Sequence, residues 1–564
     1  MGVFEFLPYV NFHELNLDWI LAKLKEYEQR LGSVEAALDA LKDTIGTTVY
    51  NVMVEWLNDG TLAGLISGAM LYKEYMIQDI NNIPVGVTFQ VGDTVTTNTA
   101  IYLVANSGIS FGIYKLVPLY YTNLSDLGLV ADGLTDDSTA FQAAYNLIYD
   151  MDMKGGTVLL NNQITLQSNS SIKNGKIKWA TNLGTAFDAS SIDNFTFDSV
   201  EFDVSASTPL GKKISIVDSN NIKLNRVYAH DWYGTFARLN NITNLEVTNS
   251  RFVNSSGGTG DVGAALYSNG GTDLYYNNLQ SKTLSDNLIY LDGSTAINNV
   301  VISNISGEGH TGTENPHVIA IYGETIGADI NNVIIKDCDN GIRIAYRNNI
   351  MPQNIVVNNV SIRNAKFAGI DIRTDTTPKV ASVILNNINI YYSFQDGIQL
   401  TNVQAVDIKN SSILACARNG IFLTNATNST IANCRIENRS DSVGVAFVKL
   451  DSDSANNVIS NCFLYNRVSG ETPTGFQDLR TITSGNNVIT LCRIVGTFVL
   501  NGYDIRTAYV LIPIDSAHAP KSNSIMFGTA SDKPTAGLAD GVYLIDSSGA
   551  SNGWHYYNGA WVQN

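Results

Sequence analysis

Short alternating segments of apolar and polar residues recur through the middle of the chain, each introduced by a glycine. In each segment two aliphatic residues flank one outward residue, and the glycines are spaced by 28, 28, 23 and 24 residues. Such alternation predicts strands with one buried face, and a repeat of about 20 to 50 residues is typical of a solenoid. We therefore expect stacked β-coils in which five phrases occupy equivalent positions: Gly341-Ile342-Arg343-Ile344, Gly369-Ile370-Asp371-Ile372, Gly397-Ile398-Gln399-Leu400, Gly420-Ile421-Phe422-Leu423 and Gly444-Val445-Ala446-Phe447.

A helical periodicity precedes this repeat, in residues 1–80. Apolar residues alternate there in steps of four and three, which forms a heptad seam. The seam predicts a coiled-coil region that joins copies of the chain, with three strands as the expected number. The alternative is an amphipathic helix packed on its own domain. The seam consists of Ile20, Leu24, Tyr27, Leu31, Val34, Leu38, Leu41 and Ile45.

Changes of pattern divide the rest of the chain into three regions. Residues 81–120 contain short alternating segments and predict a small β collar. An Asp-Gly turn and a Thr-Asp-Asp cap then lead into a helix expected over 136–150, at the start of a β-solenoid over 121–505. Residues 506–564 predict a C-terminal β module, because Asn558-Gly559 between aromatic segments indicates a hairpin. Its tryptophans are expected either to bind glycan or to be buried in a trimer tip.

Composition limits the partners of the protein. The chain has 35 basic and 52 acidic residues, a net charge of −17, which argues against nucleic acid as a ligand. No apolar stretch of about 18 residues occurs, and the first residues lack the pattern of a secretory leader. We expect no membrane insertion, no metal and no cofactor, because paired Cys or His spacings and phosphate-binding loops are absent. The five cysteines are expected to be buried, reduced thiols.

The segment from Ala131 to Ala144, ADGLTDDSTAFQAA, resembles the opening motif of the pectate-lyase-like β-helices of bacteriophage tail spikes and pre-neck appendages. Ala131 stands where that family usually has glycine. The resemblance implies a right-handed parallel β-helix, usually a homotrimer, that binds and often cleaves bacterial surface polysaccharide or teichoic acid. It also implies an N-terminal region that attaches to neck, tail or portal-proximal proteins of the virion, in a protein made in the host cytoplasm. The motif transfers a fold and not a catalytic site, so Asp132, Asp136 and Asp137 are expected to be turn and cap residues.

Aligning the glycine phrases places the outward residues of successive coils in columns. Alternate side chains of a strand face outward, and a slip of one residue would exchange the buried and exposed sets. The first column is expected to hold Tyr290, Ala320, Arg343, Asp371, Gln399 and Phe422. The second is expected to hold Asp292, Tyr322, Ala345, Arg373 and Thr401, and a third Glu324, Arg347 and Asp375.

These columns gather carboxylates, tyrosines and arginines on one wall. Glycoside hydrolysis uses two carboxyl groups, roughly 6.5–9.5 Å apart in an inverting enzyme. At about 4.8 Å per coil and about 6.8 Å per two residues, the backbones of Asp292 and Glu324 are expected to lie about 8 Å apart. The catalytic candidates are Asp292, Glu324 and Asp371, although Asp371 is also expected to pair with Arg343 and stay ionised. The substrate-binding candidates are Tyr290, Glu308, His310, Glu314, His317, Tyr322, Arg343, Arg347, Arg373 and Asp375.

Several activities fit these residues. Hydrolysis would use the carboxylates, elimination would use an arginine or histidine as the base, and phosphodiester cleavage would depend on His310 or His317. A receptor-binding or structural spike without catalysis is the alternative, since outward Asp and Arg residues also serve solubility. A second aromatic corner, Tyr228 to Tyr233, is expected to be a sugar platform or a well-packed turn.

Overall fold

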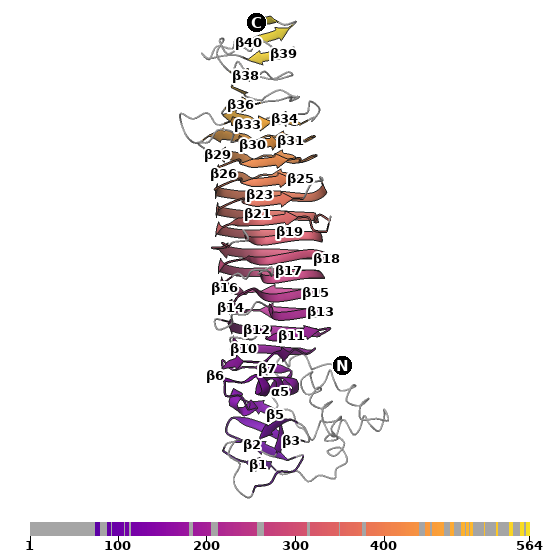
Figure 1. The fold of residues 1–564 in the computed structure, drawn as a ribbon, viewed down its shortest axis with the longest axis vertical. Helices are drawn as coiled ribbons and strands as arrows, with labels where there is room; N and C mark the ends of the chain where they lie inside the picture. Colours follow the sequence, from indigo (N-terminus) through magenta and orange to yellow (C-terminus); the bar gives the residue numbers. More distant parts are fainter. Residues whose placement is uncertain are drawn as a thin grey trace, which may run out of the picture. The chain divides into compact units, whose positions relative to one another are not determined.

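The computed structural model describes most of residues 74–466 and short segments after them (Figure 1). The chain divides into two compact units, Met1–His230 and Asp231–Asn564, and each is treated separately. The predicted coiled coil, with its seam at 20–45, lies outside the described residues. Gaps before 466 fall at 79, 81–86, 92, 106–107, 112–113, 180–183, 205–211, 257–263, 313–315, 349, 375–378, 439–445 and 452–453. Beyond 466 the described segments are 474–478, 487–490, 492–495, 497–499, 512–513, 526–527, 541–544, 553–557 and 560–563.

The first unit begins with a small sheet whose strand order is β1-β2-β3-β5-β4. Strand β2 pairs antiparallel with β3, and β5 pairs antiparallel with both β3 and β4. Its buried face contains Val95, Tyr102 and Leu116. The strands are β1 (Glu74–Met76), β2 (Thr94–Thr96), β3 (Ala100–Ala105), β4 (Ile109–Phe111) and β5 (Tyr114–Tyr121).

A short helix and a series of parallel strands follow in the same unit. The helix α5 (Ser138–Ile148) packs Phe141 against Phe187, with ring centroids 6.5 Å apart, so it covers aromatic side chains of the first coils. The preceding elements are the 3-10 helix η1 (Leu124–Leu127) and β6 (Asp132–Asp136). The following strands are β7 (Asp150–Asp152), β8 (Thr157–Leu160), β9 (Ile164–Thr165), β10 (Ser170–Trp179), β11 (Phe187–Ser190), β12 (Asp193–Asp203), β13 (Lys212–Asn225) and β14 (Tyr228–His230).

The acidic motif before α5 has the structural role expected of it. The Asp137 carboxylate accepts hydrogen bonds from the backbone N–H groups of Val130 (2.7 Å) and Ala131 (3.1 Å). Asp132 accepts from the N–H groups of Leu134 and Thr135, both at 2.7 Å. Both carboxylates therefore fold their own loop, as turn residues do.

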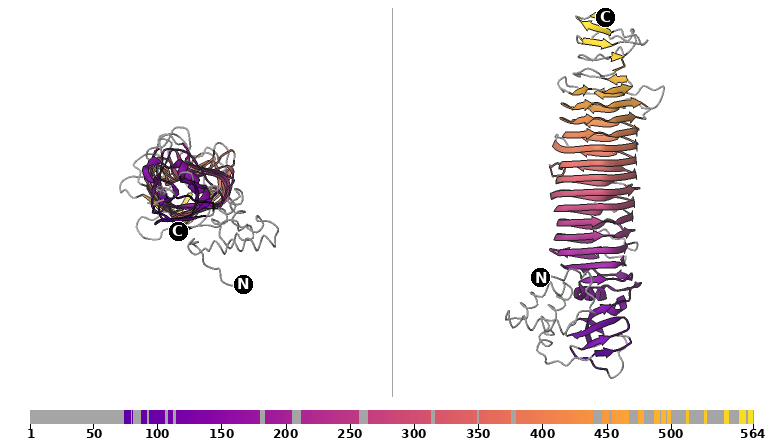
Figure 2. Two further views of the ribbon diagram at one scale, coloured as in Figure 1. Left: turned by 90° about the horizontal axis from the view of Figure 1, so that it is seen from below. Right: turned by 180° about the vertical axis from the view of Figure 1, so that it is seen from behind.

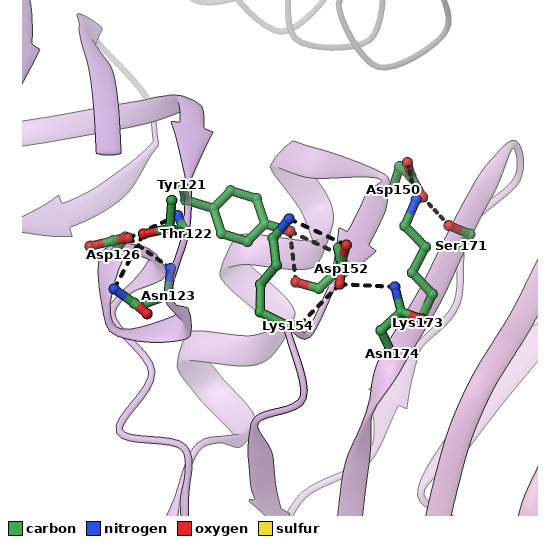
Figure 3. A network of polar contacts seen from close by, with 10 residues as sticks. All are labelled: Tyr121, Thr122, Asn123, Asp126, Asp150, Asp152, Lys154, Ser171, Lys173 and Asn174. Carbon is green, nitrogen blue, oxygen red and sulfur yellow. Dashed lines mark hydrogen bonds and ion pairs between the residues drawn. The ribbon is translucent and has the colours of Figure 1, made fainter. Parts of the chain in front are cut away.

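A tyrosine ties β5 to the first parallel strands (Figure 3). The Tyr121 hydroxyl donates to the backbone oxygen of Asp152 and accepts from its N–H, both at 2.9 Å. The Lys154 Nζ lies 5.4 Å from the centre of the Tyr121 ring and 3.3 Å from the Asp152 carboxylate. Burial raises the pKa of Tyr121 above its usual range, so the phenol stays protonated and can keep donating.

The second unit is a stack of parallel strands, one coil above another (Figures 1 and 2). Each long strand pairs residue by residue with the next coil; Ile289, for example, pairs with Ile319, and Ile319 with Ile342. The longer strands are β15 (Thr235–Thr248), β16 (Arg251–Ser255), β17 (Ala264–Leu284), β18 (Asn287–Glu308), β19 (His317–Cys338), β20 (Asn340–Ala345), β21 (Gln353–Ala365), β22 (Ile370–Arg373), β23 (Lys379–Ser393), β24 (Ile398–Thr401), β25 (Val403–Lys409) and β26 (Ser412–Cys416).

Shorter strands, β27 to β36, continue the coils towards the C-terminus, and β37 and β38 pair in a separate sheet. Strands β39, β40 and β41 form an antiparallel sheet in which Tyr557 pairs with Ala560. The strands from residue 421 onward are β27 (Ile421–Thr424), β28 (Thr430–Ala432), β29 (Arg435–Asn438), β30 (Ala446–Asp451), β31 (Val458–Ser460), β32 (Phe463–Asn466), β33 (Thr474–Asp478), β34 (Val488–Thr490), β35 (Arg493–Val495), β36 (Thr497–Val499), β37 (Ile512–Pro513), β38 (Met526–Phe527), β39 (Gly541–Leu544), β40 (Gly553–Tyr557) and β41 (Ala560–Gln563).

The repeated glycines stack because the coils approach one another too closely for a side chain. A Cβ atom on Gly369 would lie 2.8 Å from the backbone oxygen of Gly397, and one on Gly397 would lie 2.5 Å from that of Gly420. The fifth predicted phrase is wrong. Ile421 pairs with Val448, not with Val445, so Phe447 occupies the position expected for Gly444. The insertion of three residues ahead of this strand hid the true register.

Asparagines form ladders at the bends between strands. The side-chain amide of Asn387 donates to the carbonyl oxygen of the Asn359 side chain, and Asn359 donates in turn to Asn331, both at 2.8 Å. Asn359 and Asn387 have φ of 54°, in the left-handed region that asparagine tolerates better than most residues. One residue type thus supplies both the bend and the bond to the next coil.

The cysteines also belong to the architecture. All five are buried and none is in a disulfide, as expected from their repeat positions. Burial raises the pKa of the Cys338 and Cys416 thiols to about 12, so these two remain protonated at neutral pH and act as small apolar groups.

Candidate functional site

The first two of the three predicted outward columns have the expected register. Tyr290 pairs with Ala320, Ala320 with Arg343 and Arg343 with Asp371. The second column likewise runs from Asp292 to Tyr322, Ala345, Arg373 and Thr401. Sequence alignment of the repeat therefore placed these residues on the correct coils, and the alternation of the strands kept them on one face.

Three tyrosines stack along this face. The rings of Tyr267 and Tyr290 are 5.5 Å apart at 8°, and those of Tyr290 and Tyr322 are 5.0 Å apart at 27°. Ala320 pairs with Tyr290 on the next coil. The small side chain of Ala320 leaves room for the Tyr322 ring to stack on the Tyr290 ring. Offset stacking of this kind is favourable beyond the apolar area that it buries.

Arginines cover the two ends of the tyrosine stack. The guanidinium carbon of Arg238 lies 5.4 Å from the centre of the Tyr267 ring, and that of Arg343 lies 5.5 Å from the centre of Tyr322. Cation–π attraction at this distance holds the guanidinium groups over the rings at the ends of the column. We call the following nine residues the tyrosine–arginine wall: Arg238, Tyr267, Tyr290, Asp292, Tyr322, Arg343, Arg347, Asp371 and Arg373.

The stack changes the expected role of Tyr290. Its side chain is only 7% exposed, so the prediction that Tyr290 presents its ring to a ligand is wrong. Both faces are covered by Tyr267 and Tyr322, and its hydroxyl accepts a hydrogen bond from Nη1 of Arg347 at 3.0 Å. Tyr290 therefore positions its neighbours, while Tyr322 remains partly accessible.

Asp292 is buried beneath this surface. It is 2% exposed and accepts from the Tyr267 hydroxyl (2.5 Å), the Ser294 hydroxyl (2.5 Å) and Nε of Arg347 (2.9 Å). Burial, and then the hydrogen bond to Asp292, raise the pKa of Tyr267 above its usual range, so that phenol stays a donor. The prediction that Asp292 faces solvent is wrong: the carboxylate is buried, and these donors replace the water that it has lost.

Asp371 is also buried beneath arginines, on the coil that follows Arg343. It is fully buried, and its Oδ2 accepts from Nε of Arg373 at 2.6 Å and lies 3.8 Å from Nε of Arg343. The predicted ion pair with Arg343 is therefore confirmed, and Arg373 forms a closer one. A solvent-facing catalytic Asp371 is wrong for the same reason as for Asp292. Its second oxygen, Oδ1, has no hydrogen-bond partner among the described residues.

Glu324 is the remaining described carboxylate of the predicted catalytic set. It is half-buried, and it has no ion pair within the part of the chain that the structure describes. It lies two residues beyond Tyr322, the register partner of Asp292. A Cβ atom on Gly293 would lie 2.4 Å from the Glu324 nitrogen, so the two backbones are in close contact. The backbone next to Asp292 is thus close to that of Glu324, and the predicted pairing of their carboxyl groups stays a prediction.

The corner predicted at 308–317 does not act as one site. Glu308 lies on a different outward column, where it pairs with Lys282 at 3.5 Å. His310 is fully buried, its Nδ1 donates to the backbone oxygen of Asp286 (3.0 Å) and its Nε2 accepts from the Ser281 hydroxyl (2.7 Å). The prediction that His310 faces a ligand is wrong, because the corner bends inward there. Glu308 lies outside the wall, and a ligand contact of Glu308 stays a prediction. Glu314 and Asp375 lie outside the described residues.

His317 is the corner residue that approaches the wall. It is 5% exposed, and its Nε2 has no hydrogen-bond partner among the described residues. Burial, with smaller effects of Arg343 and Arg373, holds the pKa of His317 well below its usual range. Burial alone lowers the pKa of His310 to about 4. Both imidazoles are therefore neutral at pH 7, which disfavours them as general acids.

In the second aromatic corner, the contacts of Trp232 are those of a well-packed turn. Trp232 is 1% exposed, packs against Phe236 and Phe252, and donates its indole N–H to the Gly234 oxygen at 3.1 Å. In the other unit, Nε2 of His230 lies 3.1 Å from Glu201. The well-packed turn, one of the two predicted alternatives, is confirmed for Trp232.

Sequence reasoning missed Tyr267, Arg238 and Ser294. Tyr267 was identifiable in principle, because Leu266-Tyr267-Ser268 has the same alternation as Ile289-Tyr290-Leu291 one coil later. The coil around residue 270 contains a register shift between Ser268 and Gly271, which obscured the repeat. Arg238 has a comparable signal, because Ala237-Arg238-Leu239 has the same alternation one coil earlier and Arg238 pairs with Tyr267.

Two further properties concern the described residues alone. They contain no group of three or more His, Cys, Asp or Glu side chains placed to hold a metal ion. Within the same part of the chain, no helix has the length and apolar character needed to cross a membrane.

Comparison with known proteins supports the fold. Residues 352–508 match the family described as right handed beta helix region. Together with the parallel register, this match confirms the predicted mainly-β, right-handed parallel β-helix. No characterised protein sequence gives a significant match.

Solved structures with similar folds come from several sources. The surface adhesin PfbA of Streptococcus pneumoniae is 13% identical, with a TM-score of 0.41, over 78% of this chain and 99% of that one. The catalytic unit of a GH87 α-1,3-glucanase from Streptomyces thermodiastaticus is 13% identical, with a TM-score of 0.43, over 70% and 73%. Tailspike protein 3 of bacteriophage CBA120 is 12% identical, with a TM-score of 0.33, over 80% and 71%. Similarity at this level identifies neither a shared site nor a shared activity.

Proposed function

We propose that the protein binds a bacterial surface polysaccharide or teichoic acid along the tyrosine–arginine wall, as a tail spike or appendage of a bacteriophage. The observation that carries the proposal is that tyrosines, arginines and carboxylates of successive coils are linked to one another on this face. Arg343, Arg347 and Arg373 keep 25%, 38% and 41% of their side chains exposed above buried carboxylates. A flat surface of guanidinium and phenol groups suits a long polymer rather than a small molecule.

The assembly and location follow from the sequence and belong to the same proposal. The opening motif over 131–144 resembles that of phage spikes, and the heptad seam over 20–45 is suited to joining three chains. The protein would then be a homotrimer on the virion, attached through residues 1–80 to neck, tail or portal-proximal proteins. Light scattering of the full chain, compared with a variant lacking residues 1–80, tests the assembly. A monomeric full chain would contradict it.

Binding is tested with envelope glycans purified from a panel of bacteria. The full chain is immobilised and its affinity for each glycan is measured by biolayer interferometry. We expect at least one glycan to bind, and Tyr322→Ala to weaken that binding about tenfold, because the ring supports Arg343 on the wall. A surface change far from the wall, Lys282→Gln, serves as the matched control. Absence of binding to every glycan in the panel would contradict the proposal.

Depolymerisation is a second candidate, and Glu324 is the residue that favours it. Its carboxylate is half-exposed beside the backbone that carries the buried Asp292. In hydrolysis one carboxyl group protonates the leaving oxygen while a second activates water, and Asp292 is too enclosed for the second role. Size-exclusion chromatography of a bound glycan tests cleavage. Loss of cleavage in Glu324→Gln with unchanged binding supports a catalytic role, whereas no cleavage by the unmodified chain leaves the receptor-binding function alone.

A further inference from the structure

We infer that the wall is built for a polyanion: the guanidinium groups of Arg343, Arg347 and Arg373 bind carboxylate or phosphate groups of the polymer, and Asp292 and Asp371 hold those guanidinium groups in place. This inference rests on the proposed glycan-binding function and specifies its ligand class. It assigns the two aspartates as positioning residues and not as catalytic acids.

The depth of the charges on the wall is the first argument. Asp292 and Asp371 are at most 3% exposed at their side chains, while the arginines paired with them are 38% and 41% exposed. A ligand that approaches from solvent therefore meets guanidinium groups, and the carboxylates lie beneath them. The same difference in depth occurs in single pairs elsewhere, as at Arg418 and Asp396 (50% and 3%), but the wall brings two such buried carboxylates together with three partly exposed arginines.

The hydrogen bonds of the arginines are the second argument. Arg347 uses Nε for Asp292 and Nη1 for the Tyr290 hydroxyl, which leaves Nη2 without a partner among the described residues. Arg373 uses Nε and Nη2 for Asp371, which leaves its Nη1 without a partner among the described residues. A guanidinium group held on one side and unoccupied on the other is preorganised for an oxyanion.

The sharing of Asp371 is the third argument. Two guanidinium groups converge on Oδ2 of this one carboxylate, so the group of three carries one excess positive charge. His317, which lies near both arginines, is buried without a partner for Nε2 among the described residues and adds no negative charge. A local positive excess on a chain of net charge −17 is not explained by general solubility, which the acidic surface already provides.

Two polymer chemistries satisfy this site, and both place oxyanions at regular intervals. Uronate-containing polysaccharides carry carboxylates, and teichoic acids carry phosphodiesters. Arg343 and Arg347 belong to one coil and Arg373 to the next, and adjacent coils are separated by about 4.8 Å, so the guanidinium groups offer oxyanion positions on two successive coils. A neutral glycan has no group that would match the excess charge.

The experiment compares four polymers of similar length on the full chain. They are poly(glycerol phosphate), polygalacturonate, neutral dextran, and the envelope glycan that binds best in the panel described above. Affinity is measured at 50 mM and 500 mM NaCl. We expect at least one of the two polyanions to bind at least tenfold more tightly than dextran, and that advantage to fall at high salt as screening shortens the range of the charges.

Arginine variants locate the interaction. Because a hydrogen bond from a charged donor is worth enough to change affinity about tenfold, Arg347→Gln and Arg373→Gln should each weaken polyanion binding by about that factor. Arg418→Gln, an exposed arginine outside the wall columns, should leave it unchanged. Circular dichroism and thermal melting confirm that each variant is folded.

The outcomes separate the inference from the proposed function. Binding of phosphate polymer but not uronate, or the reverse, supports the inference and selects the source of the oxyanion. Tight, salt-insensitive binding of neutral glycan, unaffected by Arg347→Gln and Arg373→Gln, overturns the inference and leaves the proposed function intact. Failure of all glycans to bind overturns both.

Discussion

The asparagine ladders and the tyrosine–arginine wall both run along the coils of the second unit, but their hydrogen bonds are arranged differently. In a ladder each coil repeats the same residue, and Asn387, Asn359 and Asn331 bond in sequence. On the wall the residue changes at every coil, and bonds cross from one column to another, as Arg347 does to Asp292 and Tyr290. A residue type that is repeated on every coil indicates a structural role. On the wall the residue types differ from coil to coil, although the strands keep their register.

The comparison predicts that the ladder tolerates substitution least. Asn359→Val should lower the free energy of unfolding by about 3 kcal/mol, because a left-handed backbone costs a branched residue about 1–2 kcal/mol and each lost amide hydrogen bond about 1 kcal/mol. The φ of Asn359 is 54°, and it both donates and accepts in the ladder. Thermal melting followed by circular dichroism measures the effect. Asn359→Gly, which relieves the backbone and loses only the hydrogen bonds, should be milder; an equal loss for both would exclude backbone strain as a cause.

Acid should destabilise the protein because the buried histidines of the corner at 308–317 become protonated, and not through the charged groups of the wall. Burial lowers the pKa of His310 to about 4 from an ordinary value of 6.5, so its neutral form is favoured by folding. The stabilisation is complete above pH 6.5 and is lost as pH falls from 6.5 to about 4. Its size is on the order of 3 kcal/mol. His317 acts in the same direction.

Melting temperatures of the unmodified chain and of His310→Gln between pH 4 and pH 7.5 check this expectation. Glutamine can retain a hydrogen bond to Ser281 without titrating, so the variant should lose less stability on acidification. A pH dependence identical in the two proteins would show that His310 is not responsible.

Asp371→Asn tests whether the wall depends on its buried charge. The change leaves Arg343 and Arg373 without a counter-charge, and because both are partly exposed we expect a loss of about 1–2 kcal/mol rather than the larger penalty of a fully buried pair. Affinity for a polyanion should fall, because Arg343 and Arg373 lose the carboxylate that holds their guanidinium groups in place. Asp407→Asn, in the surface pair with Lys409 at 2.7 Å, is the matched control and should change stability by less than about 0.5 kcal/mol. Unchanged or tighter polyanion binding in Asp371→Asn would contradict the assigned positioning role.

Glu308→Gln should have the smallest effect. The Lys282–Glu308 pair is 55% and 50% exposed, and such pairs contribute about 0–1 kcal/mol. We expect a change below about 0.5 kcal/mol and unchanged glycan affinity, measured by the same melting and interferometry assays. A strong loss of glycan binding would place a second ligand site on the Glu308 column.

The sequence was sufficient for the coil repeat and for the columns, because an alternating strand leaves few choices of face once one register is known. It was not sufficient to predict which of the outward side chains are buried. Tyr290 and Asp371 are outward in direction, yet both are buried because long neighbours on adjacent coils fold over them. Whether a side chain is covered depends on the rotamers of residues about 25 positions away. No local pattern contains that information.

The corner at 308–317 failed for a related reason. A cluster of His and Glu residues in the sequence indicated a loop rich in ionisable groups, but the chain turns so that His310 points inward and Glu308 belongs to another face. The Gly444 phrase failed because three inserted residues moved the strand without changing its composition. Both errors concern bends, where the period of the strand no longer applies.

The stacked glycines set a rule for how such a wall can change length. Because a Cβ atom on Gly397 would meet the oxygen of Gly420 at 2.5 Å, each glycine is constrained by the coil above it. An insertion of one or two residues just before such a glycine would carry a side chain into that gap and move the strand that follows out of register with its partner. A whole coil, in contrast, can be added or removed with the contact renewed at the new junction. The number of ligand groups that the wall reaches can therefore evolve in whole steps, by duplication or loss of a coil, while each step keeps the spacing of its predecessors.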